Sequence, residues 1–253
     1  MVEGSVISMK KEDFFDKERY AWATHYRPKT INEMALAPAY REEFLMMEDI
    51  GYLPNSMILH GVPGCGKTTL AKILGSLPNY AFVEIDCGED NSKGHFQNLV
   101  RSITSGIVTG EKKRLVFLDE YNKMNENAQQ VLNKTIETTA ETNTFIIATN
   151  YLDKITLQLR NRCSKYHMNF CVYDDAKDNV EMFTKDHGMT QKEWITELRR
   201  AARLVAKKTK IKVPVEIFEK VEKRGDNLES VRSYMRAVST AAYYHDYKNK
   251  KIR

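Results

Sequence analysis

The sequence predicts an α/β domain built on a parallel sheet, followed by a small helical domain. Short apolar runs alternate with helix-compatible segments up to about residue 170, and this order is typical of a parallel sheet with helices on both faces. The runs are wholly apolar, as expected for strands buried on both sides. Beyond them the strand signal stops. We therefore divide the chain into an N-terminal arm (1–19), an α/β domain (20–170) and a helical domain (171–253).

Each element follows from a local pattern. Residues 39–50 carry apolar side chains at helical spacing and predict a helix. Strands are expected at 57–59, 81–85, 115–118 and 145–148, with helices between them at 67–77, 94–105 and 125–139. In the helical domain, helices are expected at 180–187, 191–208, 215–224 and 228–247. Pro214 and Gly225 supply the boundaries before the last two of these helices.

Composition narrows the class of protein. The 253 residues are 42% hydrophobic and 29% charged, which is ordinary for a globular protein. No apolar run approaches the roughly 20 residues that span a bilayer, and the N-terminus lacks a secretory signal, so no membrane association is expected. The four cysteines are scattered without metal-ligand spacing, which favours a reducing compartment: the cytoplasm (of the host, if the protein is viral) or a eukaryotic nucleus. A net charge of +5 permits nucleic-acid binding without requiring it.

A phosphate-binding motif is the strongest local signal. Residues 61–68 read GVPGCGKT and match G-x-x-x-x-G-K-[ST] in full, between a predicted strand and a predicted helix. Glycines let the backbone curl so that N–H groups face phosphate oxygens, and the helix N-terminus adds positive charge. Lys67 would reach the β- and γ-phosphates of ATP, and the Thr68 hydroxyl would coordinate Mg²⁺. The nucleotide contacts expected here are Gly61, Pro63, Gly64, Cys65, Gly66, Lys67, Thr68 and Thr69.

Two further strands end in polar side chains. Residues 115–120 form an apolar run that ends in Asp119 and Glu120, the Walker B pattern. Asp119 would hold Mg²⁺ and Glu120 would polarise the attacking water. Asn150 follows the strand at 145–148, where it could contact the γ-phosphate or simply serve as a turn residue.

Taken together, these motifs resemble the small ATPase subunits of AAA+ sliding-clamp loaders, as in replication factor C and its phage counterparts. Residues 22–30 match the W-x-x-x-Y-R-P-K-T opening of that family, residues 119–122 its D-E-x-[DN] box, and residues 148–155 its sensor 1 stretch. Residues 161–163 are similar to its S-R-C motif. The resemblance implies an AAA+ fold with a helical lid, ATP and Mg²⁺ as cofactors, and Tyr26 and Arg27 beside the adenine.

The same resemblance implies that Arg162 is an arginine finger that acts on ATP held by a neighbouring subunit. From the residue alone, a surface ion pair is the simpler interpretation. The implied partners are the sliding clamp, primer-template DNA, copies of this chain and a distinct loader subunit. Lys93 and Arg101 are the candidate contacts to DNA phosphates, although either could be an ordinary surface charge.

The sequence departs from the family pattern in three places. Asn161 replaces the serine of S-R-C, and Leu228 stands where the sensor 2 arginine is expected. Either Arg232, one helical turn beyond Leu228, substitutes for it and contacts the nucleotide, or sensor 2 is absent. The chain ends where the family's collar domain would begin, so either the sequence is truncated or its ring assembles without a collar of its own. Two other functions stay open: another AAA+ ATPase acting on DNA, such as a helicase loader or branch-migration motor, and a catalytically silent ATP-binding scaffold.

Overall fold

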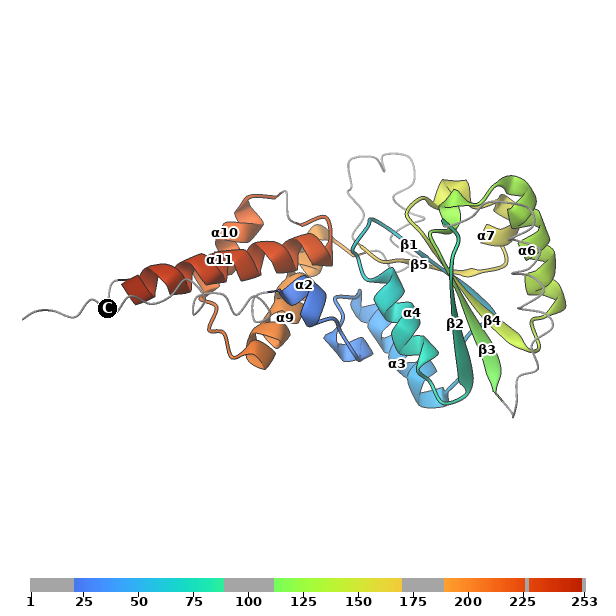
Figure 1. Cartoon of the computed structure of the whole chain (residues 1–253), viewed down its shortest axis with the longest axis horizontal. Coiled ribbons are helices and arrows are strands. Elements are labelled where there is room, and N and C mark those ends of the chain that lie inside the picture. Colours follow the sequence, from blue (N-terminus) through green and yellow to red (C-terminus); the bar gives the residue numbers. More distant parts are fainter. Residues whose placement is uncertain (1–20, 89–111, 170–188, 226–227, 252–253) are drawn as a thin grey trace, which may run out of the picture.

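The computed structural model describes residues 21–88, 112–169, 189–225 and 228–251. Five parallel strands form one sheet in the order β2-β3-β4-β1-β5. Figure 1 shows the sheet at one end of the molecule and a group of helices at the other. The strands are β1 (Ser56–His60), β2 (Tyr80–Asp86), β3 (Lys113–Asp119), β4 (Asn143–Thr149) and β5 (Ser164–His167).

Helices cover both faces of the sheet (Figure 1). Alternate residues of each strand point to opposite sides, so Leu59 and Phe117 pack with α3 (Pro38–Ile50) and α4 (Lys67–Gly75). Ile58 and Val116 instead pack with α6 (Glu126–Thr138) and α7 (Leu157–Arg160). Single helical turns lie at α2 (Trp22–His25), η2 (Ile31–Glu33), η3 (Tyr121–Lys123) and η4 (Leu152–Lys154).

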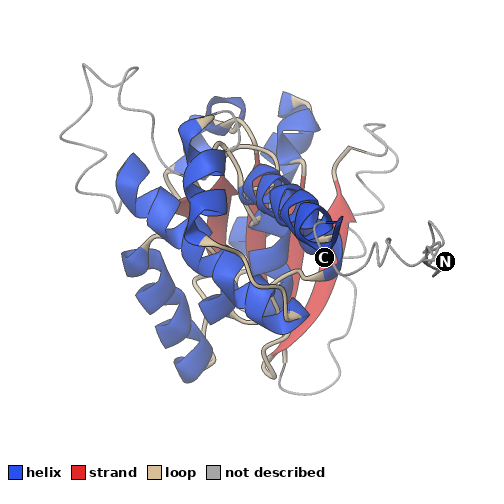
Figure 2. Ribbon diagram, turned by 90° about the vertical axis from the view of Figure 1, so that its left-hand side faces the viewer, coloured by secondary structure: helices blue, strands red, loops and turns tan. Residues whose placement is uncertain are grey.

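The helical part contains α9 (Gln191–Thr209), α10 (Val215–Lys223) and α11 (Val231–Lys251). A capping box between Thr190 and Glu193 starts α9, since each side chain accepts a hydrogen bond from the other residue's backbone N–H. The core on the α3 face of the sheet continues into this part through Trp194, Phe218 and Tyr234. Figure 2 looks along the molecule from this end and shows the helices in front of the sheet.

The predicted α/β fold with a parallel sheet and following helices is confirmed, and four of the five strands lie where the sequence places them. The fifth strand, β5, was not predicted from the sequence, because it is short and polar and lies at the edge of the sheet, where it pairs only with β1. The last helix begins at Val231 rather than at Leu228. The predicted helices at 94–105 and 180–187 and the arm at 1–19 lie outside the described residues, and the domain boundary near residue 170 stays a prediction.

A buried glutamine ties α6 to the segment that leads into α7. The Gln129 side chain donates to the carbonyl oxygens of Met124 (3.2 Å) and Lys154 (3.0 Å) and accepts from the Thr156 N–H (3.1 Å). We expect Gln129→Ala to lower the free energy of unfolding by about 3 kcal/mol, because three buried polar groups lose their partner. Urea denaturation measures this change. The exposed neighbour Gln130 provides the control, and an equal loss in Gln130→Ala would contradict the explanation.

Candidate functional site

The glycine-rich loop connects β1 to α4 and has the conformation that its glycines permit. Gly61 has φ 141° and Gly64 has φ 83°, in the region that other residues rarely adopt. A side chain at either position would also lie too close to neighbouring atoms. A Cβ on Gly61 would lie 2.3 Å from Asn169 Oδ1, and one on Gly64 would lie 2.9 Å from Arg232 Cβ. The loop is therefore packed between the end of the α/β part and the start of α11.

Lys67 is the buried cation of the site, with 8% of its surface exposed. Its ammonium group donates to the carbonyl oxygens of Gly61 (2.6 Å) and Val62 (3.1 Å) and to Asn150 Oδ1 (2.8 Å). These contacts hold Nζ beneath the glycine-rich loop, where a phosphate bound by the loop would meet it. Lys67 and Asn150, two separately predicted site residues that lie far apart in the chain, are thus brought together.

Thr68 and Asp119 form the candidate magnesium site. The Thr68 hydroxyl donates to Asp119 Oδ2 (2.8 Å), and Asp119 Oδ1 accepts from the Glu120 N–H (2.9 Å). A hydroxyl and a carboxylate oxygen suit Mg²⁺, which takes few protein ligands and completes its shell with water and phosphate oxygens. Consistent with that, the described residues contain no group of three or more His, Cys, Asp or Glu side chains able to hold a metal ion by themselves.

Glu120 follows Asp119 in a left-handed conformation, with φ 52°. This turn sends its side chain away from the strand axis, and its carboxylate forms an ion pair with Lys123, one turn of η3 further on. The hydrogen bond to Glu120 raises the pKa of the Lys123 amine. A single ion pair at this exposed position contributes little to the stability of the fold. The carboxylate stays accessible at the carboxyl edge of the sheet, where a water-activating group is expected.

Asn122 is a functional candidate that the sequence interpretation did not single out. Its Oδ1 accepts from the Asn150 N–H (3.3 Å) and from the Thr149 hydroxyl (3.3 Å), so it fixes the end of β4 and the orientation of Asn150. The only signal in the sequence was its place as the last residue of the D-E-x-[DN] box. We expect it to act by positioning Asn150.

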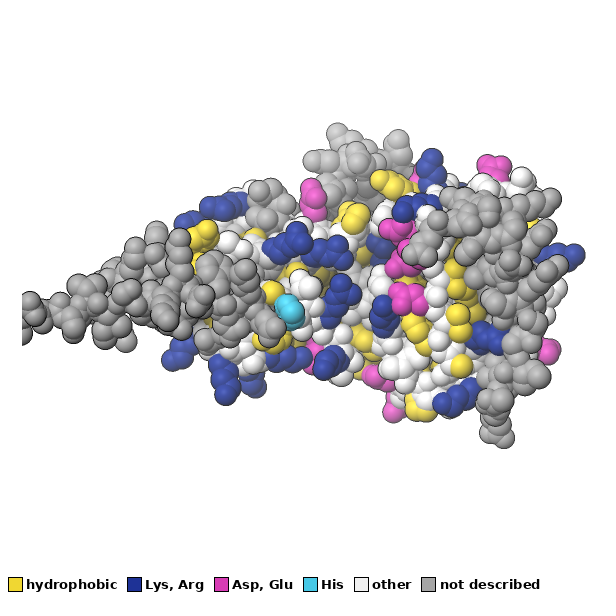
Figure 3. Space-filling view, in the orientation of Figure 1, with side chains coloured by type: hydrophobic (Ala, Val, Ile, Leu, Met, Phe, Trp, Pro, Cys, Tyr) yellow, Lys and Arg dark blue, Asp and Glu magenta, His cyan; other side chains and the backbone are white. Residues whose placement is uncertain are grey.

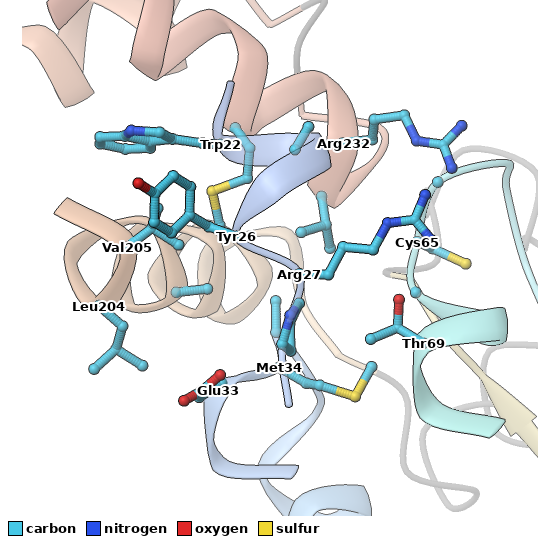
Figure 4. A pocket seen from close by; sticks show the side chains of 18 of the residues that line it. Trp22, Tyr26, Arg27, Glu33, Met34, Cys65, Thr69, Leu204, Val205 and Arg232 are labelled. Carbon is cyan, nitrogen blue, oxygen red and sulfur yellow. The ribbon is translucent and has the colours of Figure 1, made fainter. Parts of the chain in front are cut away.

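A cleft of about 310 Å³ opens beside the glycine-rich loop, between the α/β and helical parts. Figure 4 shows Arg27 and Arg232 extending toward the loop residue Cys65, while Trp22, Tyr26 and Val205 lie toward the other end. Of the predicted nucleotide contacts, the cleft is lined by Tyr26, Arg27, Gly64, Cys65, Gly66, Lys67, Thr68, Thr69 and Arg232. The predicted contacts Gly61 and Pro63 do not line the cleft.

Leu228 and Arg232 differ in their surroundings. Leu228 is buried, and its carbonyl oxygen accepts from the indole N–H of Trp194 (2.7 Å). Arg232 lies at the start of α11, where its backbone N–H donates to the Gly64 carbonyl (3.2 Å). Its backbone thus rests against the glycine-rich loop and its side chain enters the cleft. The geometry supports Arg232, and not the position of Leu228, as the source of a cation for the nucleotide.

Arg162 does not line the cleft of its own chain. It follows α7, is 41% exposed at its side chain, and forms an ion pair with Glu137 of α6. The surface ion pair that the residue alone suggests is therefore present. Action on a neighbouring subunit's nucleotide stays a proposal. The predicted DNA contacts Lys93 and Arg101 lie outside the described residues.

Charge is unevenly distributed over the surface. In the space-filling view of Figure 3, Lys and Arg side chains gather over the helical part, whereas acidic side chains are concentrated over the α/β part. The basic face would favour contact with a polyanion.

Among the described residues, no helix is both long and apolar enough to cross a membrane.

Two stacked histidines lie directly behind the loop. The rings of His60 and His167 are 4.7 Å apart at an interplanar angle of 22°. Burial, together with the charges of His167, Lys67 and Lys165, lowers the pKa of His60 to about 3. Burial, with the nearby Lys67, also lowers the pKa of His167. Both rings are therefore neutral in the folded protein near neutral pH.

The low pKa of His60 predicts a loss of stability in mild acid. The unfolded chain binds a proton at His60 below about pH 6.5, whereas the folded chain does not, so acid favours unfolding. From about pH 7 to about pH 5 this difference costs about 2 kcal/mol. We expect His60→Phe to lose correspondingly less stability over this range in urea titrations. The exposed His25 is the control; a His60→Phe variant with the same pH dependence as wild type would contradict the assignment.

The fold and the motif geometry define the class of this protein, and comparisons with known proteins agree. Residues 57–170 match the family model described as "ATPase family associated with various cellular activities (AAA)". Over these residues the α/β part is thus similar to AAA ATPase domains. A mutant of RuvB from Thermotoga maritima has the same fold, with a TM-score of 0.59 at 20% identity, covering 83% of this chain and 64% of that one.

Within this class, the chain is similar to the small subunits of replication factor C, and the resemblance seen in the motifs is confirmed. It is 26% identical over 174 residues to the small subunit of Methanocella arvoryzae, covering 66% of this chain and 54% of the relative. It is 29% identical over 176 residues to that of Sulfolobus acidocaldarius (67% and 54%) and 30% identical over 167 residues to subunit 4 of Oryza sativa subsp. japonica (62% and 49%). The chain spans about half the length of these relatives.

Proposed function

We propose that this protein is an ATPase subunit of a DNA sliding-clamp loader. One observation carries the proposal beyond the similarity to replication factor C subunits. The expected nucleotide residues Lys67 and Thr68 line one cleft and the Thr68 hydroxyl bonds Asp119, whereas Arg162 lies on the surface outside this cleft. An arginine placed in this way can complete a nucleotide site only on a neighbouring subunit. The chain is therefore built to act in an assembly.

At the cleft, each side chain has a distinct task. The Lys67 ammonium would neutralise the β- and γ-phosphates, and Thr68 with Asp119 would hold Mg²⁺. Bound Mg²⁺ supplies positive charge for the phosphate oxygens during transfer. Glu120 would orient and polarise the attacking water, and Asn150 would hydrogen-bond the water or the γ-phosphate. Arg232 adds a second cation from the helical part, which couples the lid to the phosphates.

ATP binding, rather than its chemistry, would do the mechanical work. The γ-phosphate contacts Lys67 in one subunit and Arg162 of the next, and so favours the assembled state of the ring. That assembly would comprise copies of this chain and a distinct loader subunit, open the clamp and admit primer-template DNA. Hydrolysis removes the bridging phosphate and shifts the population back, releasing the clamp on DNA.

Steady-state ATP hydrolysis, measured with and without primed DNA and the sliding clamp from the same source, tests this function. Any cognate loader subunit is included. Turnover that rises strongly only when DNA and clamp are both present is the expected result. A turnover rate that does not change when DNA and clamp are added would instead assign the chain to another AAA+ motor, such as a helicase loader or branch-migration enzyme. Tight ATP binding with no turnover under any condition would show a silent scaffold.

A further inference from the structure

A buried carboxylate outside the predicted site joins the two parts of the molecule. Glu197 lies on α9 with 7% of its surface exposed. It forms ion pairs with Arg41 of α3 and with Arg200 of its own helix, the latter at 2.9 Å. Burying a carboxylate costs hydration free energy unless charged partners replace the lost water, and here two guanidinium groups do so. We call these three residues the Glu197 network.

The arginines of the network bind the backbone of residues 32–36, a segment that we call strip 32–36. Arg41 Nη2 donates to the carbonyl oxygens of Leu36 (3.1 Å) and Met34 (3.4 Å). Arg200 donates to the carbonyl oxygens of Asn32 (2.7 Å) and Met34. The two guanidinium groups that pair with Glu197 thus also bind three backbone carbonyl oxygens of the strip. Lys208, further along α9, adds an exposed ion pair to Glu33 of the same strip (2.6 Å).

Strip 32–36 and α9 form one wall of the nucleotide cleft. Glu33, Met34 and Ala35 line it from the strip, and Leu204, Val205 and Lys208 line it from α9. Figure 4 shows the Met34 side chain extending toward Thr69, while the side chain of the adjacent Glu33 points the other way. The Met34 methyl group would be 3.1 Å from a Cβ on Gly66, so the strip also touches the phosphate loop. Any shift of α9 against the strip changes the width of this cleft.

We propose that Glu197 is a positioning residue for nucleotide binding, which docks α9 on strip 32–36 and so shapes the part of the cleft wall that lies outside the phosphate loop. The proposal rests on the ATP-binding function proposed above. The phosphates meet the loop and Lys67, whereas the base and ribose face the largely apolar wall that the Glu197 network assembles. The network therefore acts on the nucleoside half of the ligand and leaves the phosphate half to the loop.

The test compares two ligands in two variants. Glu197→Gln keeps the shape of the side chain and removes its charge. Glu222→Gln does the same to the Arg199–Glu222 pair, which lies wholly within the helical part and away from the cleft. Equilibrium binding of a fluorescent ATP analogue gives the nucleotide Kd, and competition by inorganic tripolyphosphate reports the phosphate loop alone. Thermal unfolding of each variant without ligand measures general destabilisation.

Glu197→Gln is expected to raise the Kd for the nucleotide by about tenfold or more while leaving tripolyphosphate affinity within about twofold. Glu222→Gln is expected to lower the unfolding temperature without changing either affinity. The proposal is overturned if Glu197→Gln behaves like Glu222→Gln, or if both ligands weaken equally. Should Glu197→Gln fail to fold, Arg200→Gln, at a more exposed position, must show the same selective loss. A wild-type chain that binds neither ligand would refute the proposed ATPase function itself.

Discussion

Arg162→Ala is expected to leave ATP binding unchanged and to lower turnover of the assembled complex by about 1,000-fold or more. The guanidinium lies outside its own cleft, so its loss removes no contact to the nucleotide held by the same chain. In the assembly, it would stabilise charge on the phosphoryl group held by the next subunit, an interaction made mainly in the transition state. Nucleotide affinity and steady-state hydrolysis, measured on the same preparation, separate the two effects.

Lys134→Ala is the matched control for this prediction. Lys134 is also an exposed cation beside Glu137, on the same helix, but it carries no motif assignment. Its removal should change turnover by less than about twofold. Normal hydrolysis by an assembled Arg162→Ala complex would mean that Arg162 only forms the ion pair seen with Glu137.

Lys67→Ala is expected to weaken ATP binding by about 100-fold or more, and turnover falls with it. The ammonium group would make at least two charged hydrogen bonds to phosphate, each contributing roughly 1.5–3 kcal/mol. The Lys67 ammonium group is already held in place by Gly61, Val62 and Asn150, so binding loses little conformational entropy in this side chain. Titration with a fluorescent ATP analogue measures the loss.

Lys72 offers the comparison on the same helix. Its ammonium group is about half exposed and pairs with Glu84 at 3.0 Å, outside the cleft. Lys72→Ala should bind ATP as wild type does. If Lys67→Ala bound ATP equally well, the assignment of this cleft to the triphosphate would be wrong, whereas equal losses in both variants would indicate a general effect of charge.

The predictions that succeeded concern residues close together in the chain. The glycine-rich loop is a strand, a turn and a helix in one stretch, so its conformation follows from local steric rules at Gly61 and Gly64. The centres of β3 and β4, residues 115–118 and 145–148, are apolar and are followed by polar side chains, which places Asp119 and Asn150 at the carboxyl edge of a parallel sheet. The pairing of Lys67 with Asn150 follows from that topology.

The predictions that failed, or were never made, concern contacts between distant segments. Strand β5 is short and polar, so only its pairing with β1 reveals it as a strand. The residues of α9 that line the cleft carry no motif, and Glu197 looks in sequence like an ordinary surface charge on an amphipathic helix. Its burial depends on how α9 meets α3, which no local pattern specifies.

The sequence by itself therefore determined the AAA-type domain, the phosphate loop and the acidic edge of the sheet, because these depend on the steric and hydrogen-bonding preferences of contiguous residues. The tertiary structure alone decided that Arg232 and not Leu228 enters the cleft, that Arg162 stays outside it, and that Glu197 joins the two parts. Such contacts are set by the packing of whole helices, in which many weak side-chain interactions act together across long separations in the chain.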